Sequence, residues 1–170
     1  RSTPPYRRQR QMCIRDRIIC DHEFDYCIDY IELTLSLSMA KTWKDADISL
    51  DHIKDQTVAV IGYGIQGDAQ ANNMKDSGLK VIVGLREGSP TWNKAKEDGH
   101  QVMSVADATK QADIVHILLP DMVQAKVYKE EIGPNLSEGN ALSFSHAAAI
   151  YWKWIDAPEN VDLIMVAPIG

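Results

Sequence analysis

From Thr57 onward, short apolar runs rich in β-branched residues alternate with longer stretches of mixed apolar and polar residues. The short runs predict β-strands, and the mixed stretches predict helices. The expected strands cover 57–61, 79–85, 100–103, 113–120, 141–145 and 162–168, and the expected helices cover 66–77, 92–98, 105–111 and 122–132.

This regular alternation of strands and helices favours an α/β fold with a parallel sheet. The runs 58–61, 81–83 and 114–119 are almost continuously apolar, which suits strands that helices cover on both faces. We therefore expect a Rossmann-like, doubly wound, mostly parallel sheet.

The composition of the chain limits the classes of molecule that it could bind. A chain of 170 residues with 45% hydrophobic residues can form one domain with a sizeable core. Its formal net charge of -6 argues against a nucleic-acid partner, because nucleic-acid binding needs a basic surface. No apolar run approaches the roughly 18 residues that span a bilayer. We expect a soluble, cytoplasmic protein with no nucleic-acid and no membrane partner.

The first 38 residues differ from the rest in composition. Six of the seven arginines lie in residues 1–17, and all three cysteines, Cys13, Cys20 and Cys27, lie in this region. A zinc site would usually need a fourth ligand and closer cysteine pairs, so we assign no metal. We expect Met39 to be the native start and residues 1–38 to be a non-native or disordered extension.

The stretch "TVAVIGYGIQGDAQANNMKDSG" carries the strongest motif. Gly62, Gly64 and Gly67 follow a predicted strand and open a predicted helix, which is the context that a dinucleotide-binding turn requires. The first glycine would allow a tight turn, the second a close approach of the pyrophosphate, and the third close packing of helix on strand. A glycine turn in another α/β fold remains the alternative.

The end of the second predicted strand bears on the choice of cofactor. NAD-specific sites usually carry an acidic residue there, and "VIVGLREGSPTW" instead offers Arg86, Ser89 and Thr91. One cation and two hydroxyl groups suit the 2'-phosphate of NADP, although the carboxylate of Glu87 would repel that phosphate. NADP(H) is therefore favoured over NAD.

Two further segments end predicted strands at the same edge of the sheet. Pro120 and Asp121 follow one strand, and Asp121 suits either a helix N-cap or a cofactor contact. His146 follows the next strand and is expected to face the nicotinamide end. His116 lies within an apolar strand and is expected to be a hydrogen-bonded core residue.

These motifs, in their order, resemble the NADPH-binding domain of the ketol-acid reductoisomerase family. The resemblance runs over residues 39–170 and includes "MAKTWKDADISLDHI", "VIVGLREGSPTWNKAKEDG", "ILLPDMVQ", "LSFSH" and "MVAP". It implies that residues 39–170 are an NADP-binding Rossmann domain, truncated at its C-terminal end. The implied catalytic residue is His146, and the implied cofactor-binding residues are Gly62, Tyr63, Gly64, Ile65, Gln66, Gly67, Arg86, Ser89, Thr91, Pro120, Asp121, Met122, Val123 and Gln124.

The resemblance also implies a reaction: 2-acetolactate or 2-aceto-2-hydroxybutyrate is rearranged and reduced with NADPH and Mg2+ in valine and isoleucine biosynthesis. The family's magnesium ligands belong to an all-helical C-terminal domain, so none is expected in this chain. We expect the chain to bind NADPH but to be inactive alone, and the full-length enzyme to be a homo-oligomer.

Departures from the family pattern leave alternatives open. Ile65 stands where a small residue is common, "AAAIYWKWI" follows His146, and Ile169 stands where the family has lysine. A stand-alone dinucleotide-binding sensor without catalysis is the main alternative. Another NADP-linked dehydrogenase would share the glycine turn but would not explain "GYGIQG", "LLPDMVQ" and "FSH" together.

Overall fold

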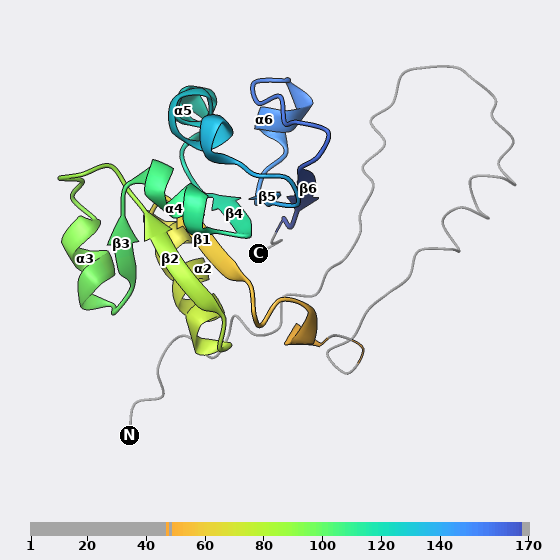
Figure 1. The fold of residues 1–170 in the computed structure, drawn as a ribbon. Helices are drawn as coiled ribbons and strands as arrows, with labels where there is room; N and C mark the ends of the chain where they lie inside the picture. The colour runs from red at the N-terminus through yellow and green to blue at the C-terminus, as the bar shows by residue number, and fades with distance from the viewer. Residues whose placement is uncertain (1–46, 48, 168–170) are drawn as a thin grey trace, which may run out of the picture. The chain divides into compact units, whose positions relative to one another are not determined.

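The computed structural model describes residue 47 and residues 49–167 of the chain (Figure 1). Leu50–Ala167 form one compact unit, and this unit is described by itself. The expectations about residues 1–38 and about Ile169 lie outside the described residues.

Six strands form one sheet in which every neighbouring pair is parallel. The strand order is β3-β2-β1-β4-β5-β6, which runs from left to right in Figure 1. The parallel sheet expected from the sequence is confirmed. The strands are β1 (Thr57–Ile61), β2 (Lys80–Gly84), β3 (Gln101–Met103), β4 (Ile114–Ile117), β5 (Ala141–Phe144) and β6 (Asp162–Met165).

Helices connect the strands, as parallel pairing requires. They are α2 (Ile65–Asp76), α3 (Trp92–Glu97), α4 (Val105–Gln111), α5 (Asp121–Val127) and α6 (Ala148–Tyr151), with 3-10 turns at Leu50–His52 and Gly133–Asn135. The helix expected over 122–132 is wrong in part, because α5 ends at Val127 and a π-helical turn covers Tyr128–Ile132. That turn buries both Tyr128 and Ile132. Helix α6 was not predicted.

Both faces of the sheet are covered, and β1 shows this best because all five of its residues are buried. Successive side chains of a strand point to opposite faces. Val58 and Val60 pack in a cluster with Ala71 of α2 and Ala95 of α3. Ala59 and Ile61 belong to the other cluster, which contains buried residues of α4 and of β4 and β5, among them Val105, Ala108, Val115 and Leu142. The doubly wound arrangement is therefore confirmed.

The register aligns the carboxyl ends of the strands. Ile61 pairs with Gly84 on one side and Ile117 on the other, Ile117 pairs with Phe144, and Phe144 pairs with Met165. The loops that follow these residues consequently lie along one edge of the sheet. Between β1 and β4 the strand order reverses, and in open α/β sheets ligands bind at this edge beside such a reversal.

Candidate functional site

The glycine turn follows β1 directly and has the geometry that its spacing predicts. Gly62 has φ +102°, and a Cβ placed on it would lie 2.9 Å from the backbone oxygen of Leu118. A Cβ on Gly67 would lie 2.1 Å from the backbone oxygen of Gly62. By contrast, apart from Gly64 itself and its two neighbours in the chain, no described residue comes within 4 Å of a Cβ placed on Gly64. The turn is therefore packed tightly at its first and third glycines and open at the second.

Helix α2 begins at this open side. Gly64 is its N-cap, and no side chain caps the helix. The first amides of a helix lack partners within the helix and carry partial positive charge, so they attract anions. Ile65 is 90% exposed, and Gln66 is exposed beside it. The turn and the helix start thus present backbone amides without a large covering side chain.

Tyr63 differs from its neighbours because its side chain points away from the open side. The side chain is buried, its hydroxyl donates to Asp98 Oδ2 at 2.8 Å, and Asn72 Nδ2 donates to that hydroxyl at 3.2 Å. Burial and the hydrogen bond to Asp98 raise the pKa of Tyr63, so the hydroxyl keeps its proton. Only the backbone of Tyr63 is left to line the turn, a feature that the glycine spacing did not predict.

The loop after β2 carries the three residues expected at a 2'-phosphate. Arg86 is exposed, and its guanidinium makes no hydrogen bond or ion pair within the described part of the chain. The hydroxyl of Ser89 is buried and has no hydrogen-bond partner among the described residues. Thr91 precedes α3, and its side chain does not cap that helix. A buried hydroxyl without a partner is uncommon, and on a loop that also carries a cation it suits an anion. Glu87 is also exposed on this loop.

One expectation about the loop after β4 is not met by the structure. Asp121 was predicted as a possible helix N-cap, and this is wrong, because Pro120 holds that position and Asp121 is the first residue of α5. A carboxylate in the first turn still interacts favourably with the helix dipole. Gln124 Nε2 donates to the backbone oxygen of Leu119 at 2.7 Å and to Asp121 Oδ1 at 3.2 Å. Met122 is 89% exposed and Val123 is 41% exposed.

His146 lies on the loop after β5, where it meets Asp121. The distance from His146 Nδ1 to Asp121 Oδ2 is 3.9 Å, and the side chain of His146 is 71% exposed. The backbone amide of Ala148 donates to His146 Nδ1 at 3.3 Å, which leaves Nε2 free to hold a proton toward solvent. The structure therefore brings together two residues that are separated in the sequence by a helix and a strand.

His116 is confirmed as a hydrogen-bonded core residue. Its Nδ1 lies 2.9 Å from Ser143 Oγ, and its Nε2 lies 2.7 Å from Gln70 Oε1. Burial lowers the pKa of His116, so the ring is neutral near pH 7. Gln70 also contacts Ser145 Oγ at 3.2 Å, which links α2 to the residue before His146. Nothing in the local sequence around Gln70 indicated this role.

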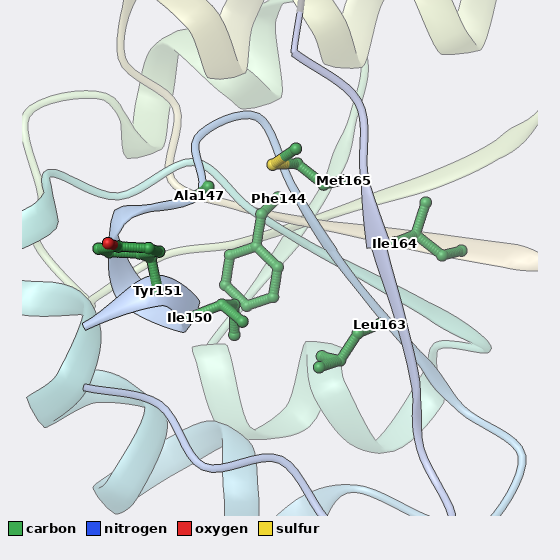
Figure 2. A pocket seen from close by; sticks show the side chains of 7 residues that line it. All are labelled: Phe144, Ala147, Ile150, Tyr151, Leu163, Ile164 and Met165. Carbon is green, nitrogen blue, oxygen red and sulfur yellow. The ribbon is translucent and has the colours of Figure 1, made fainter. Parts of the chain in front are cut away.

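An apolar groove of about 260 Å³ lies between α6 and β6, as Figure 2 shows. It offers no cation or hydroxyl suited to a phosphate except the hydroxyl of Tyr151, so we do not assign it to the dinucleotide. The residues that line it are Phe144, Ala147, Ile150, Tyr151, Leu163, Ile164 and Met165.

The described residues contain no group of three or more His, Cys, Asp or Glu residues that could hold a metal ion. Asp121 and His146 alone do not fit Mg2+, which prefers several oxygen ligands in octahedral geometry. None of the described helices has the length and apolar character needed to cross a membrane.

The strand order, the reversal between β1 and β4 and the glycine turn define a dinucleotide-binding domain of the Rossmann type. Residues 52–170 match the family described as "Acetohydroxy acid isomeroreductase, NADPH-binding domain". The chain belongs to this family, which confirms the resemblance seen in the sequence and agrees with the expected NADP(H) cofactor.

Individual relatives carry the name ketol-acid reductoisomerase (NADP(+)). The chain is 81% identical over 132 residues to ketol-acid reductoisomerase (NADP(+)) of Nitrosopumilus maritimus, covering 78% of this chain and 40% of that protein. The protein of the same name from Cenarchaeum symbiosum is 73% identical over 132 residues, with the same coverage. The chain thus spans about 40% of the length of these relatives.

A solved structure supports the same fold. An NADH-preferring ketol-acid reductoisomerase from an uncultured archean aligns with a TM-score of 0.71 and 50% sequence identity. The alignment covers 74% of this chain and 40% of that chain.

Proposed function

We propose that this chain is the NADP(H)-binding part of a ketol-acid reductoisomerase. The full-length protein would convert 2-acetolactate or 2-aceto-2-hydroxybutyrate to the 2,3-dihydroxy acid in valine and isoleucine biosynthesis, with NADPH and Mg2+. The observation that supports the proposal is that two features suited to anions lie at one edge of the sheet. One is the glycine turn, open at Gly64, and the other is the Arg86 loop, where the hydroxyl of Ser89 has no hydrogen-bond partner among the described residues.

The residues divide into three groups by position. The backbone amides at the start of α2 would hold the pyrophosphate, and Arg86, Ser89 and Thr91 would hold the 2'-phosphate. Pro120 to Gln124 and His146 would border the nicotinamide and the substrate, because they follow β4 and β5 at the reversal of strand order. Bound NADPH would supply the hydride for the reduction. At that site His146 would hold a proton at Nε2, and the backbone amide of Ala148, which donates to Nδ1 at 3.3 Å, would orient the ring.

Charges on the Arg86 loop bear on the preference for the phosphorylated cofactor. The carboxylate of Glu87 is exposed on the same loop as Arg86, and the solved relative is NADH-preferring. Two features of this chain favour NADP(H) nonetheless: the free guanidinium of Arg86 and the buried, unpartnered Ser89 hydroxyl.

Calorimetry with NADPH and NADH tests the proposal. We expect the 170-residue chain to bind NADPH more tightly than NADH, and Arg86→Ala to reduce that preference about tenfold, because a charge-assisted hydrogen bond contributes about 1.5 to 3 kcal/mol. Lys126→Ala, on exposed α5, is a matched control that removes a cation outside the loop. Equal affinities of the unmutated chain for the two cofactors would contradict the assignment of the Arg86 loop.

A further inference from the structure

A chain of polar contacts joins the glycine turn to the far end of α3. His100 Nε2 lies 3.0 Å from Asn72 Oδ1, Asn72 Nδ2 donates to the hydroxyl of Tyr63 at 3.2 Å, and this hydroxyl donates to Asp98 Oδ2 at 2.8 Å. Every bond has a donor and an acceptor when His100 carries its proton on Nε2. We call these four residues the Tyr63 relay.

Burial of Tyr63 and His100 favours the hydrogen bonds of the Tyr63 relay. Tyr63 is 2% exposed and His100 is 6% exposed, so both rings are shielded from water, and the hydrogen bonds of the relay are partly buried. Their rings also meet edge to face, with centroids 5.6 Å apart. Burial raises the pKa of Tyr63 and lowers that of His100, which keeps both side chains neutral near pH 7.

Other contacts in the same region hold the two helices together. Lys94 of α3 pairs with Asp68 of α2. Lys75 of α2 donates to the backbone oxygens of Asp98 at 2.7 Å and Gly99 at 3.0 Å. Both lysines lie on exposed surface, where an ion pair such as that of Lys94 contributes little. The partly buried hydrogen bond from the Tyr63 hydroxyl joins the glycine turn directly to the side chain of Asp98.

This connection has a consequence for the two anion sites. Tyr63 stands between Gly62 and Gly64 in the turn proposed to hold the pyrophosphate. Asp98 follows α3, and α3 begins at Trp92, directly after the loop proposed to hold the 2'-phosphate. A short helix behaves as a rigid rod, so fixing its end to the turn also fixes the distance between the turn and the loop.

We propose that the hydrogen bond from Tyr63 to Asp98 sets the spacing of the two phosphate sites and thereby contributes to selectivity for NADP(H) over NAD(H). Tyr63 is in this role a positioning residue, because its side chain is buried away from the open side of the turn. The inference rests on the proposed function. Its physical reason is that NADPH engages both sites, whereas NADH lacks the phosphate that reaches the second site and is less sensitive to their spacing.

The test compares Tyr63→Phe with Tyr128→Phe. Tyr128 is also buried, and its hydroxyl makes one hydrogen bond, to the backbone oxygen of Asp156 at 2.9 Å, in the other core cluster. Both variants lose a buried hydroxyl. Affinities for NADPH and NADH are measured by calorimetry, and thermal melts establish that each variant is folded. We expect Tyr63→Phe to lower the ratio of NADPH to NADH affinity about threefold to tenfold, and Tyr128→Phe to leave it unchanged.

A second pair of variants keeps the test decisive if Tyr63→Phe does not fold. Asp98→Asn retains an acceptor for the Tyr63 hydroxyl and should keep the wild-type ratio, whereas Asp98→Ala removes the acceptor and should lower it. An equal loss of both affinities in Tyr63→Phe, or an unchanged ratio in Tyr63→Phe and Asp98→Ala, would overturn the inference alone. Equal affinities in the wild-type chain would overturn the proposed selectivity and this inference with it.

Discussion

At the scale of single residues, the three glycines of the turn are distinct because their surroundings differ. Gly67 has a backbone oxygen 2.1 Å from where its Cβ would be, whereas Gly64 has no neighbour within 4 Å. The spacing of the three glycines in the sequence was enough to predict this difference, since the helix can pack on the strand only if the third residue lacks a side chain.

Alanine substitutions at these two positions should therefore have different effects, one on the stability of the fold and the other on the affinity for NADPH. Gly67→Ala forces the Gly62 carbonyl to move and should lower the free energy of unfolding by about 3 kcal/mol, in the range of overpacked cores. Gly64→Ala should change stability by less than about 1 kcal/mol, because Gly64 has φ -81°, which alanine adopts readily. Its methyl group should instead lower NADPH affinity roughly tenfold, which corresponds to about 1.4 kcal/mol.

Urea unfolding and calorimetry on the same two proteins check this pair. A Gly64→Ala protein that binds NADPH as the wild type does would mean that phosphate does not approach the turn from its open side. A Gly67→Ala protein of wild-type stability would contradict the close packing of α2 on the turn.

Other single residues could not be assigned from the sequence. Tyr63 stands between two glycines of the motif and was expected to line the cofactor, yet its side chain points into the opposite side of the turn and is buried. The partners that hold it, Asn72 and Asp98, lie nine and 35 residues further along the chain. Side-chain direction at a turn depends on such distant partners, and no local pattern encodes them.

At the scale of elements, strands and most helices were predictable because each has a regular apolar pattern. The π-helical turn at Tyr128–Ile132 was not, because its apolar residues are compatible with an ordinary helix. Helix α6 is only four residues long and follows "SHA", which gives no clear start signal. The order of the strands in the sheet is the one that the fold class implies. The contacts between α2, β4 and β5 could not be predicted, because the apolar pattern of a single element does not indicate its polar partners on other elements.

Those contacts centre on His116 and imply a dependence of stability on pH. Its pKa in the folded protein is lowered by burial from 6.5, so below pH 6.5 the unfolded chain binds more protons than the folded one. The contribution of His116 to the free energy of unfolding should therefore be fully present above pH 6.5. As the pH decreases below 6.5, the free energy of unfolding should fall by at most about 1.4 kcal/mol per pH unit for one histidine. His100, whose pKa burial also lowers, contributes in the same direction.

Substitution of His116 should weaken the dependence of the free energy of unfolding on pH, that is, give a smaller slope. His116→Gln keeps a polar group near Gln70 and Ser143 but removes the titrating ring, while Ser143→Ala removes a partner and retains the ring. Urea unfolding between about pH 5 and pH 7 should give a smaller slope for His116→Gln than for wild type, and a wild-type slope at lower overall stability for Ser143→Ala. Identical slopes for wild type and His116→Gln would show that the buried ring is not the group responsible.

At the scale of the whole molecule, the dinucleotide sites and the chemistry of the substrate have different structural requirements. The loops proposed to hold the two phosphates lie within Leu50–Ala167, so we expect cofactor binding to need only this compact unit. The loops after β4 and β5 bring Asp121 and His146 to within 3.9 Å of each other, at the edge proposed for the nicotinamide, and the chain spans about 40% of the length of its relatives. Position at the sheet edge was predictable for these residues, whereas the surroundings that complete a substrate site were not.

We therefore expect this 170-residue chain to bind the cofactor without catalysing the reaction. It should bind NADPH but show no magnesium-dependent oxidation of NADPH when 2-acetolactate is supplied. Hydride transfer requires the substrate carbonyl to be held against the nicotinamide, and one carboxylate with one imidazole is too small a donor set to fix Mg2+ for that purpose.

The measurement follows NADPH absorbance with 2-acetolactate and Mg2+ present, after calorimetry has established that the chain is loaded with cofactor. The full-length ketol-acid reductoisomerase of Nitrosopumilus maritimus, 81% identical over the shared 132 residues, is the positive control under the same conditions. Because the control is 81% identical over the 132 residues that the two proteins share, a loaded but inactive chain beside an active control would locate the missing requirement outside that shared part. Turnover by the 170-residue chain that a chelator abolishes would contradict the prediction, since it would require magnesium ligands within the chain itself.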